Sequence, residues 1–307
     1  MLFDRSGMRR SIVVIGATAL VAGLVAWGAS ATTGPSTSAQ LDIRSATLPL
    51  LPADIEARGR FNIAVKCDSP PFGSMVKGRH VGVDVEIAQQ LALQAFGNKS
   101  RVDFTCVTTP QRESALTSGS VDLVIATFSY TPDRDTRIDF SRAYYKATGR
   151  LLVKRGSAVQ SLADVRGARI ATTSGSIYDR WLAKCFPTTK RVLSDKFTGA
   201  VAQWRSKKAD ALMWDDAALV DIASRDRTAV ILRDTFLPSP YGIGIQQGNA
   251  QLKRWVDTRL DLLRLKDTFA KILSRNFPLH LYASFRKNVL GPKNSFGYPK
   301  GSVEECP

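Results

Sequence analysis

The sequence predicts an α/β fold whose sheets are mostly parallel and flanked by helices. Three observations support this prediction. Short apolar runs alternate with amphipathic segments over residues 61–128, and the alternation restarts after Tyr145. The apolar run at 121–128 also ends in hydroxyl side chains, as expected at the carboxyl edge of an open sheet. A chain of 307 residues is long enough for one large or two small domains.

The first half of the chain contains a β-α-β-α-β series. Ile87, Leu91 and Ala95 share one face of the first helix, which is the spacing of an amphipathic helix. A strand, a helix and a further strand in this order favour parallel pairing. The predicted elements are strands at 61–66, 102–107 and 121–128, a helix opening at 82–87 and a helix at 111–117.

The second half repeats the pattern with other lengths. A glycine at position 167 is expected to end a short helix, and serines at 174 and 176 are expected to precede another. The predicted elements are extended segments at 151–154, 169–173, 211–214 and 241–245, and helices at 161–167, 176–184, 201–207, 251–263 and 267–275.

The stretch 121–134 is the most informative part of the chain. Thr131 suits the cap of a helix and Pro132 suits its first position. Ser129 and Arg134 would then lie together at the carboxyl end of a strand. An arginine fork beside free hydroxyls is suited to binding a carboxylate. The alternative is that Arg134 is an ordinary surface residue of the helix.

This stretch, with Tyr144 and Tyr145 behind it, resembles the polar amino-acid-binding proteins of bacterial ABC importers, the family 3 solute-binding proteins. The resemblance runs from about Arg58 to Phe277. It implies a type II periplasmic-binding fold: two lobes, joined by two crossovers near 147–150 and 237–242, with the ligand in the cleft between them. The implied parts are lobe 1 at 58–148 and 242–277, lobe 2 at 149–241, and a C-terminal tail at 278–307 without an assigned role.

The resemblance also implies how the α-carboxylate of an amino acid would be held. Arg134 and Ser129 match the carboxylate clamp of the family, and Thr127 occupies the position that offers backbone groups. Ser176 lies where a strand turns into a helix, and a helix N-terminus presents free N–H groups to an anion. The alternative for Ser176 is a plain helix cap.

Asp215 matches the family's ligand-binding aspartate, which would hold the ammonium group of the amino acid. The alternative is that Asp215 caps the following helix, but Asp216 is better placed for that role.

Two further cations are candidates for the ligand side chain. Lys66 ends the first strand and Arg112 follows the second, as in family members that bind glutamate or aspartate. Many other members carry an aromatic residue where this chain has Ser69. The alternative is that Lys66 or Arg112 points away, or pairs with Glu86 or Glu113.

A count of charges favours an acidic ligand. Three cations (Lys66, Arg112 and Arg134) face one anion, Asp215, and a buried charge without a partner costs about 3–5 kcal/mol. Glutamate or aspartate would supply a negative charge, and glutamine would not. The predicted ligand is therefore an acidic amino acid, with glutamine or another polar amino acid as the alternative.

Three apolar residues complete the predicted site. Phe72 matches the first loop of the family and is either a ligand contact or a core residue. Trp214 precedes Asp215 and is expected to line the cleft. Ile177 stands where the family often has a small residue, which would favour a short ligand such as aspartate.

The N-terminus is typical of an exported protein. Arginines precede an uncharged run at 12–29, and small residues at 29–31 fit a cleavage site. Residues 1–31 are predicted to be a signal peptide, with a retained membrane anchor as the alternative, and 32–57 a linker. An extracytoplasmic, periplasmic location follows from this prediction.

Export to an oxidising compartment favours disulfides. Cys67 and Cys106 end strands that would be neighbours in this fold, so they are predicted to pair. Pairing of the remaining Cys185 and Cys306 would fasten the C-terminal tail. The alternative is four free thiols.

Other functional classes have less support. The net charge of +16 comes from scattered basic residues without a nucleic-acid motif, and two histidines give little support for a metal site or a Ser-His-Asp triad. We expect no cofactor and no catalysis, although the same fold resembles dehydratases, for which Glu113 is the nearest acid–base candidate. The resemblance implies a monomer that delivers its ligand to an ABC permease. A membrane-anchored sensor is the other alternative.

Overall fold

The computed structural model describes residues 48–301 and 304–307. The predicted signal peptide or anchor at 1–31 lies outside these residues, as does the linker up to residue 47. Within the described part, no helix is long and apolar enough to cross a membrane. The end of the expected linker is helical, because the apolar Leu51 and Ile55 are buried in the neighbouring core.

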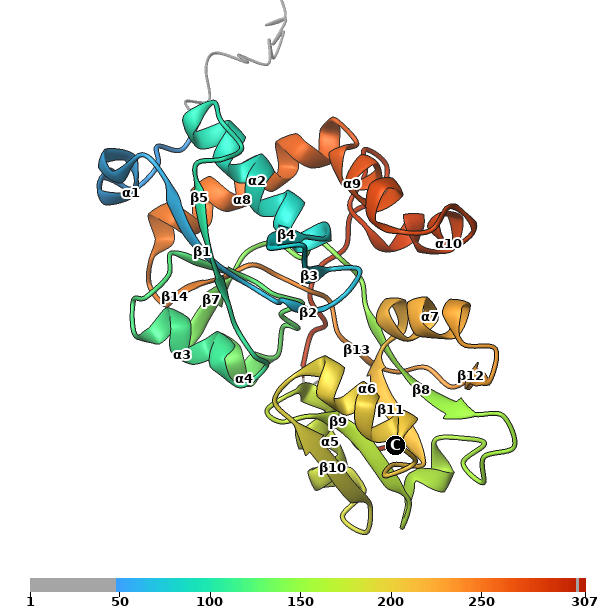
Figure 1. Ribbon diagram of the computed structural model, residues 1–307. Helices are drawn as coiled ribbons and strands as arrows, with labels where there is room; N and C mark the ends of the chain where they lie inside the picture. Colours follow the sequence, from blue (N-terminus) through green and yellow to red (C-terminus); the bar gives the residue numbers. More distant parts are fainter. Residues whose placement is uncertain (1–47, 302–303) are drawn as a thin grey trace, which may run out of the picture. The chain divides into compact units, whose positions relative to one another are not determined.

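Lobe 1 is built on a five-stranded sheet (Figure 1). In spatial order its strands are β5 (Val102–Cys106), β1 (Phe61–Val65), β6 (Leu123–Ile125), β14 (Gly244–Gln246) and β7 (Ile138–Phe140). A small antiparallel sheet, which the sequence analysis did not predict, comprises β2 (Asp68–Ser69), β3 (Gly73–Val76) and β4 (Arg79–Val81). The helices that accompany these sheets are α1 (Ala53–Arg58), α2 (Val83–Phe96), α3 (Gln111–Thr117), α4 (Pro132–Asp135), α8 (Ala250–Leu265), α9 (Thr268–Asn276), α10 (Leu279–Phe285) and the 3-10 helix η2 (Arg286–Asn288).

Lobe 2 is built on a second sheet of six strands. Five strands follow one another in the order β10 (Lys190–Ser194), β9 (Arg169–Thr173), β11 (Ala211–Asp215), β8 (Thr148–Lys154) and β12 (Ala229–Ile231), and β13 (Phe236–Pro238) also pairs with β8. The helices of this lobe are η1 (Ala163–Val165), α5 (Ile177–Cys185), α6 (Phe197–Arg205) and α7 (Asp216–Arg225).

Both sheets are mixed, whereas the sequence predicted mostly parallel ones. β1 runs parallel to β5 and β6, and β9 runs parallel to β10 and β11. β14 is antiparallel to both of its neighbours, and so is β8. β8 and β14 are the strands by which the chain enters each sheet after it crosses from the other lobe. A repeated βαβ pattern predicts only parallel neighbours, so it does not predict these two strands.

Each lobe buries its own hydrophobic core. In lobe 1, Phe61 of β1 packs against Trp255 of α8 with 5.6 Å between ring centroids. In lobe 2, Trp181 of α5 stacks on Phe236 at 5.3 Å. The two cores meet at α7 of lobe 2, because Ala217 of this helix is buried with the core of lobe 1. Motion of the lobes about the segments that connect them would part this contact.

The connecting segments pair with each other. The backbone N–H of Tyr241 donates to Tyr145 O at 2.8 Å, and that of Ser239 donates to Ala147 O at 2.9 Å. A third segment joins them from the C-terminal tail, because Val289 forms a bridge with Tyr145. The hinge therefore contains three extended segments, two of which are the crossovers expected from the resemblance.

Several predicted elements differ from the observed ones for local reasons. The strand expected at 121–128 is regular only at Leu123–Ile125, since Thr127 adopts a φ of 45° that ends the ladder. The helix expected at 161–167 is a single 3-10 turn. α6 begins at Phe197, four residues before the expected start, because Phe197 and Ala200 are buried against the sheet. The helix at 111–117 and the strand at 169–173 have the predicted bounds.

Both predicted disulfides are present. Cys67 bonds to Cys106 across the neighbouring strands β1 and β5, with 5.5 Å between Cα atoms. Cys185 at the end of α5 bonds to Cys306, with 5.2 Å between Cα atoms. The first bond lies within lobe 1, and the second fastens the C-terminal tail to lobe 2.

We predict that replacing both cysteines of the first disulfide (Cys67→Ser with Cys106→Ser) lowers the free energy of unfolding by about 2–4 kcal/mol, because the unfolded chain then loses a cross-link that spans 39 residues. Urea denaturation followed by circular dichroism measures the change. An unchanged denaturation midpoint would show that the bond contributes nothing to stability.

Candidate functional site

The candidate site lies around the segment that connects the end of β6 to the start of α4. The backbone N–H of Thr127 donates to Asp84 Oδ2 at 2.8 Å, which holds this residue in its left-handed conformation. Thr131 then caps α4 by accepting a bond from the backbone N–H of Arg134 at 3.2 Å. Thr131 and Pro132 therefore have the helix-capping roles that the sequence predicted.

Arg134 is a buried cation, and each nitrogen of its guanidinium group donates one hydrogen bond to a protein acceptor. Nε donates to Glu113 Oε1 at 3.0 Å, and Nη1 donates to Ser129 O at 2.9 Å. Nη2 donates at 3.0 Å to Gly175 O, which belongs to lobe 2. Burial, followed by repulsion from Arg112 and Arg180, lowers the pKa of Arg134 to about 9. Arg134 is therefore not the surface residue of the alternative interpretation.

Arg112 is also buried, and both guanidinium groups lie against the ring of Phe128. The carbon atom Cζ of Arg112 lies 4.8 Å from the ring centroid of Phe128, and that of Arg134 lies 5.0 Å away. Arg112 donates only to carbonyls: Nε to Thr109 O at 3.1 Å, and Nη1 to Ala126 O and Thr127 O at 3.2 and 2.8 Å.

The environment of Arg112 is electrostatically unbalanced. Among residues 48–301 and 304–307, no carboxylate forms a salt bridge with it. Burial lowers its pKa to about 10, and the strongest opposing effect is attraction to Asp215. Arg112 is thus a buried cation that hydrogen bonds satisfy in part and no paired anion neutralises.

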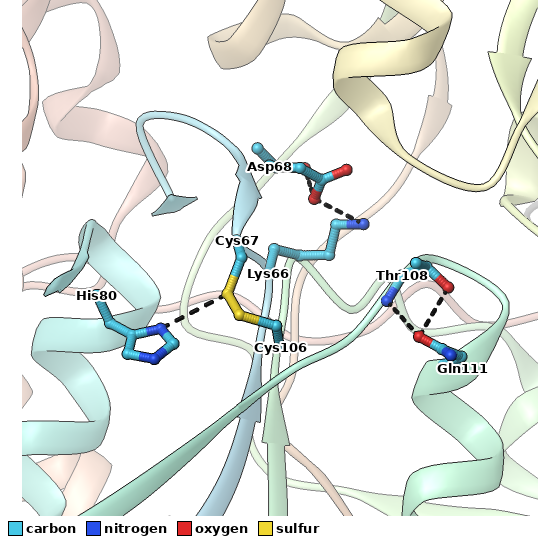
Figure 2. Close-up of a disulfide and its surroundings, with 8 residues drawn as sticks. Lys66, Cys67, Asp68, His80, Cys106, Thr108 and Gln111 are labelled. Carbon is cyan, nitrogen blue, oxygen red and sulfur yellow. Dashed lines mark hydrogen bonds and ion pairs between the residues drawn. A yellow bond between two sulfur atoms is a disulfide. The ribbon is translucent and has the colours of Figure 1, made fainter. Parts of the chain in front are cut away.

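Lys66 has a partner that the sequence analysis did not consider. Figure 2 shows Lys66 reaching toward Asp68, while Cys67 turns toward Cys106 and His80. Lys66 Nζ lies 3.0 Å from Asp68 Oδ1 and donates to Thr109 Oγ1 at 3.3 Å. Burial lowers the pKa of Lys66 to about 8, against the attraction of Asp68.

Asp215 lies at the carboxyl end of β11 and is buried. Its Oδ1 accepts bonds from Tyr178 Oη at 2.6 Å and Ser239 Oγ at 3.0 Å. Burial raises the pKa of Asp215, and these hydroxyls partly oppose that shift. The Asp215 carboxylate makes no cap bond to α7, while Asp216 Oδ1 accepts from the next backbone N–H at 2.8 Å. Asp215 therefore occupies the N-cap position without a cap bond, and Asp216 is the first residue of the helix, so neither side chain forms the cap that the sequence predicted for Asp216.

Ser176 caps α5, because its Oγ accepts from the backbone N–H of Asp179 at 3.1 Å. The residue before it, Gly175, supplies the carbonyl that Arg134 bonds across the lobes, and Arg180 Nη1 donates to the same carbonyl at 3.3 Å. Ile177 is buried as the first residue of α5. The turn before α5 thus contacts Arg134 of the other lobe through the Gly175 carbonyl.

The structure brings together most, but not all, of the predicted residues. Thr127, Ser129 and Arg134 of lobe 1 lie with Lys66 and Arg112 at the carboxyl ends of β1, β5 and β6. Ser176, Ile177 and Asp215 lie at the corresponding ends in lobe 2. The cations are almost completely buried: 0% of Lys66, 3% of Arg112 and 1% of Arg134 is exposed.

Phe72 and Trp214 pack in cores. Phe72 packs edge-on against Tyr145, Tyr241 and Phe277, with ring centroids 4.8, 5.2 and 6.1 Å away. Phe72 is therefore a core residue beneath the hinge, which is the second of the two interpretations that its sequence position allowed. Trp214 stacks on Phe197 at 5.0 Å, inside the core of lobe 2.

Sequence analysis missed several partners of the site. Asp68 is two residues from Lys66, and Asp84 stands in the first turn of α2, so both were visible as acidic residues near strand ends. Tyr178 and Ser239 reach Asp215 from 37 and 24 residues away, and no local pattern indicates them. Glu113 was considered as a partner of Arg112, but it pairs with Arg134 and Arg137.

Known proteins share this arrangement of lobes. Residues 61–278 match the family model of bacterial extracellular solute-binding proteins, family 3. The chain is 26% identical over 226 residues to a glutamine-binding protein of an ABC transporter from Bacillus subtilis, which covers 73% of this chain and 83% of that protein. It is 32% identical over 193 residues to a glutamine-binding protein from Geobacillus stearothermophilus, covering 62% and 74%. The crystal structure of a cysteine-binding protein from Campylobacter jejuni superposes with a TM-score of 0.72 at 25% identity, covering 74% of this chain and 92% of that one.

The chain therefore belongs to the family 3 extracellular solute-binding proteins, and its fold is the two-lobed periplasmic-binding fold of that family. The relatives are solute-binding proteins, so the protein is a binding protein and not an enzyme.

We predict that Asp84→Asn changes how stability depends on pH. Burial raises the pKa of Asp84 to about 7. The folded state therefore holds this proton more tightly than the unfolded state, and stability falls as pH rises from about 4 to about 7. Asparagine stays neutral, so the stability of the variant relative to wild type should be greater at pH 7.5 than at pH 5. Urea denaturation at both values tests this, and an equal difference at the two pH values contradicts it.

Proposed function

We propose that the protein is the extracytoplasmic binding subunit of an amino-acid ABC importer and that it binds an acidic amino acid, glutamate or aspartate, between its lobes. The observation that carries the choice of ligand is the burial of Arg112 without a carboxylate partner among the described residues. Membership of the family supports the role in solute binding, and the names of the relatives support an amino acid as the solute.

The groups shared by all amino acids have matching partners in the site. Arg134 would hold the α-carboxylate by exchanging its bonds to the carbonyls of Ser129 and Gly175 for bonds to the ligand, while Glu113 keeps Nε oriented. The N–H groups at the start of α5 would add to this. Asp215 would pair with the ammonium group, which would share this carboxylate with the hydroxyls of Tyr178, Ser239 and Tyr241.

The excess of positive charge in the site is smaller than the count from the sequence, because two of the cations have carboxylate partners. Asp68 compensates Lys66, and Glu113 compensates Arg134. Arg112 is the remaining cation, and Asp215 is the carboxylate that attracts it most strongly. Once the ligand's ammonium pairs with Asp215, a second carboxylate is needed to balance Arg112. Glutamate and aspartate would supply that group on their side chains.

Glutamine is the second candidate. Two of the relatives are glutamine-binding proteins, and the ion pairs of Lys66 and Arg134 reduce the charge excess that an anionic ligand would have to neutralise. A glutamine amide oxygen would accept a hydrogen bond from Arg112 but would leave its charge unpaired.

We predict that Arg112→Met lowers the affinity for glutamate by about 100-fold or more, because the ligand carboxylate loses its buried partner. Calorimetric titration of ligand-stripped protein with glutamate, aspartate and glutamine measures the change. Arg169→Met is the matched control. Arg169 is exposed at the start of β9, the end that lies away from the candidate site, and it pairs with Asp210. The acidic ligand would be rejected if the wild type bound glutamine tightly but not glutamate, and if Arg112→Met left the glutamine affinity unchanged. That outcome would still support the role of an amino-acid receptor.

We further predict that glutamate affinity falls as pH rises above about 8, because the pKa of Lys66 in the ligand-free protein is about 8 and its neutral form no longer attracts an anion. Titrations at pH 7, 8 and 9 measure this. Lys66→Met is the reference protein, because the ammonium group of the ligand titrates equally with both proteins. Identical pH profiles for the two proteins would exclude Lys66 from ligand binding.

A further inference from the structure

We propose that residues 289–301 and 304–307 attach the C-terminal segment to both lobes as a strap, which lies beside the binding site and limits how far the lobes separate. The inference concerns the motion of the lobes and does not depend on which amino acid binds. Residues 302–303 lie outside the described part of the chain, so the argument uses the contacts on either side of them. In Figure 1 the chain passes from α10, which packs with lobe 1, to an end that lies in lobe 2.

The first half of the strap is attached to the hinge and to lobe 1. Val289 bridges to Tyr145, and the backbone N–H of Lys146 donates at 2.7 Å to the carbonyl of the preceding residue, Asn288. Tyr298 stacks on Tyr130 with 4.0 Å between ring centroids, and its hydroxyl donates to Ser141 O at 2.6 Å.

Gly242, in the second crossover, makes room for this attachment. A Cβ atom there would lie 1.9 Å from the hydroxyl oxygen of Tyr298, so the tyrosine occupies the space that any larger residue would need. The strap is therefore packed against the crossover as well as against lobe 1.

The other half is attached to lobe 2 by one helix, α5. Trp181 Nε1 donates to Glu305 O at 2.9 Å, and Lys184 Nζ donates to Glu304 O at 3.1 Å. The covalent bond between Cys185 and Cys306 completes the attachment. Thus the strap has a non-covalent anchor on lobe 1 and a covalent anchor on lobe 2.

Between these anchors the strap passes beside the ligand site. A pocket of about 660 Å³ is lined by Thr131 and Pro132 at the start of α4, and by Tyr298 and Glu304 of the strap. Arg180 links the strap to the clamp, because its Nη2 donates to Glu304 Oε1 at 2.9 Å and its Nη1 to Gly175 O. That carbonyl is also the acceptor for Arg134.

The length of the strap sets a limit on opening. Six peptide units separate Tyr298 from Glu304, and a fully extended chain advances about 3.3–3.6 Å per residue. These two anchors therefore cannot lie more than about 20–22 Å apart unless one of them detaches. The crossovers alone would permit rotation about the hinge, and the strap adds a second restraint at the site.

A restrained open form has a consequence for binding. Ligand binding requires the lobes to close on the ligand. Molecules whose lobes are far apart cannot bind, so the apparent affinity falls as their fraction rises. A receptor held near the closed arrangement therefore binds more tightly. Release of the strap should therefore weaken binding and widen the ligand-free ensemble.

The test is small-angle X-ray scattering of the ligand-free protein in three variants. Cys185→Ser with Cys306→Ser removes the covalent anchor. A second variant keeps every anchor but lengthens the strap by six residues of Gly-Ser inserted after Gly301, which is exposed. Cys67→Ser with Cys106→Ser is the matched control, because that disulfide lies within lobe 1.

We expect a larger radius of gyration for the first two variants and an unchanged one for the control. Equal scattering by the wild type and the lengthened protein would overturn the proposal, and so would equal opening in the control, which would indicate a general loss of stability. If the double serine variant does not fold, the lengthened variant decides alone. A titration with glutamate should show about a 3- to 10-fold loss of affinity for the first two variants and no loss for the control. The scattering result stands even if the proposed ligand is wrong.

Discussion

The burial of the Arg134 guanidinium between the lobes is the interaction on which the rest of the site depends. A charged group removed from water needs hydrogen-bond partners, and here each guanidinium nitrogen has one: Glu113 of α3, the carbonyl of Ser129, and the carbonyl of Gly175 in lobe 2. One side chain therefore fixes the position of α3, α4 and the start of α5 relative to one another. The second buried guanidinium, that of Arg112, lies against the same ring, Phe128.

The charges of the site are balanced in pairs, with one exception. Lys66 lies against Asp68 and Arg134 against Glu113, so neither requires a ligand to be neutralised. Arg112 and Asp215 attract each other without forming a salt bridge. An amino acid that bears a second carboxylate would pair with both of these groups at once. The same desolvation that lowers the pKa of Lys66 and raises that of Asp84 makes the site sensitive to pH.

The two cores meet at α7, whose Ala217 is buried with the core of lobe 1, and the segments between the lobes determine how they move. The paired crossovers at Tyr145 and Tyr241 form the hinge, and the C-terminal segment joins them at Val289 before it reaches lobe 2 at Cys306. Solute-binding proteins work by a difference in free energy between open and closed forms. A strap that restricts the open form would act on that difference without touching the ligand.

The fold class, most helix and strand positions, the cap at Thr131 and the strand-end position of Arg134 could be predicted from the sequence, because they follow from periodicity and local residue chemistry. The pairing of the cysteines and the position of Asp215 were predictable through the resemblance to a known family. Only the tertiary structure decided which charges pair, that Phe72 is a core residue beneath the hinge, and that Tyr178 and Ser239 hold Asp215. It also decided that the antiparallel β8 and β14 make both sheets mixed. The physical reason is distance along the chain: ion pairs and packing join residues tens of positions apart, and a local pattern contains no information about which of several acidic neighbours will be nearest once the chain has folded.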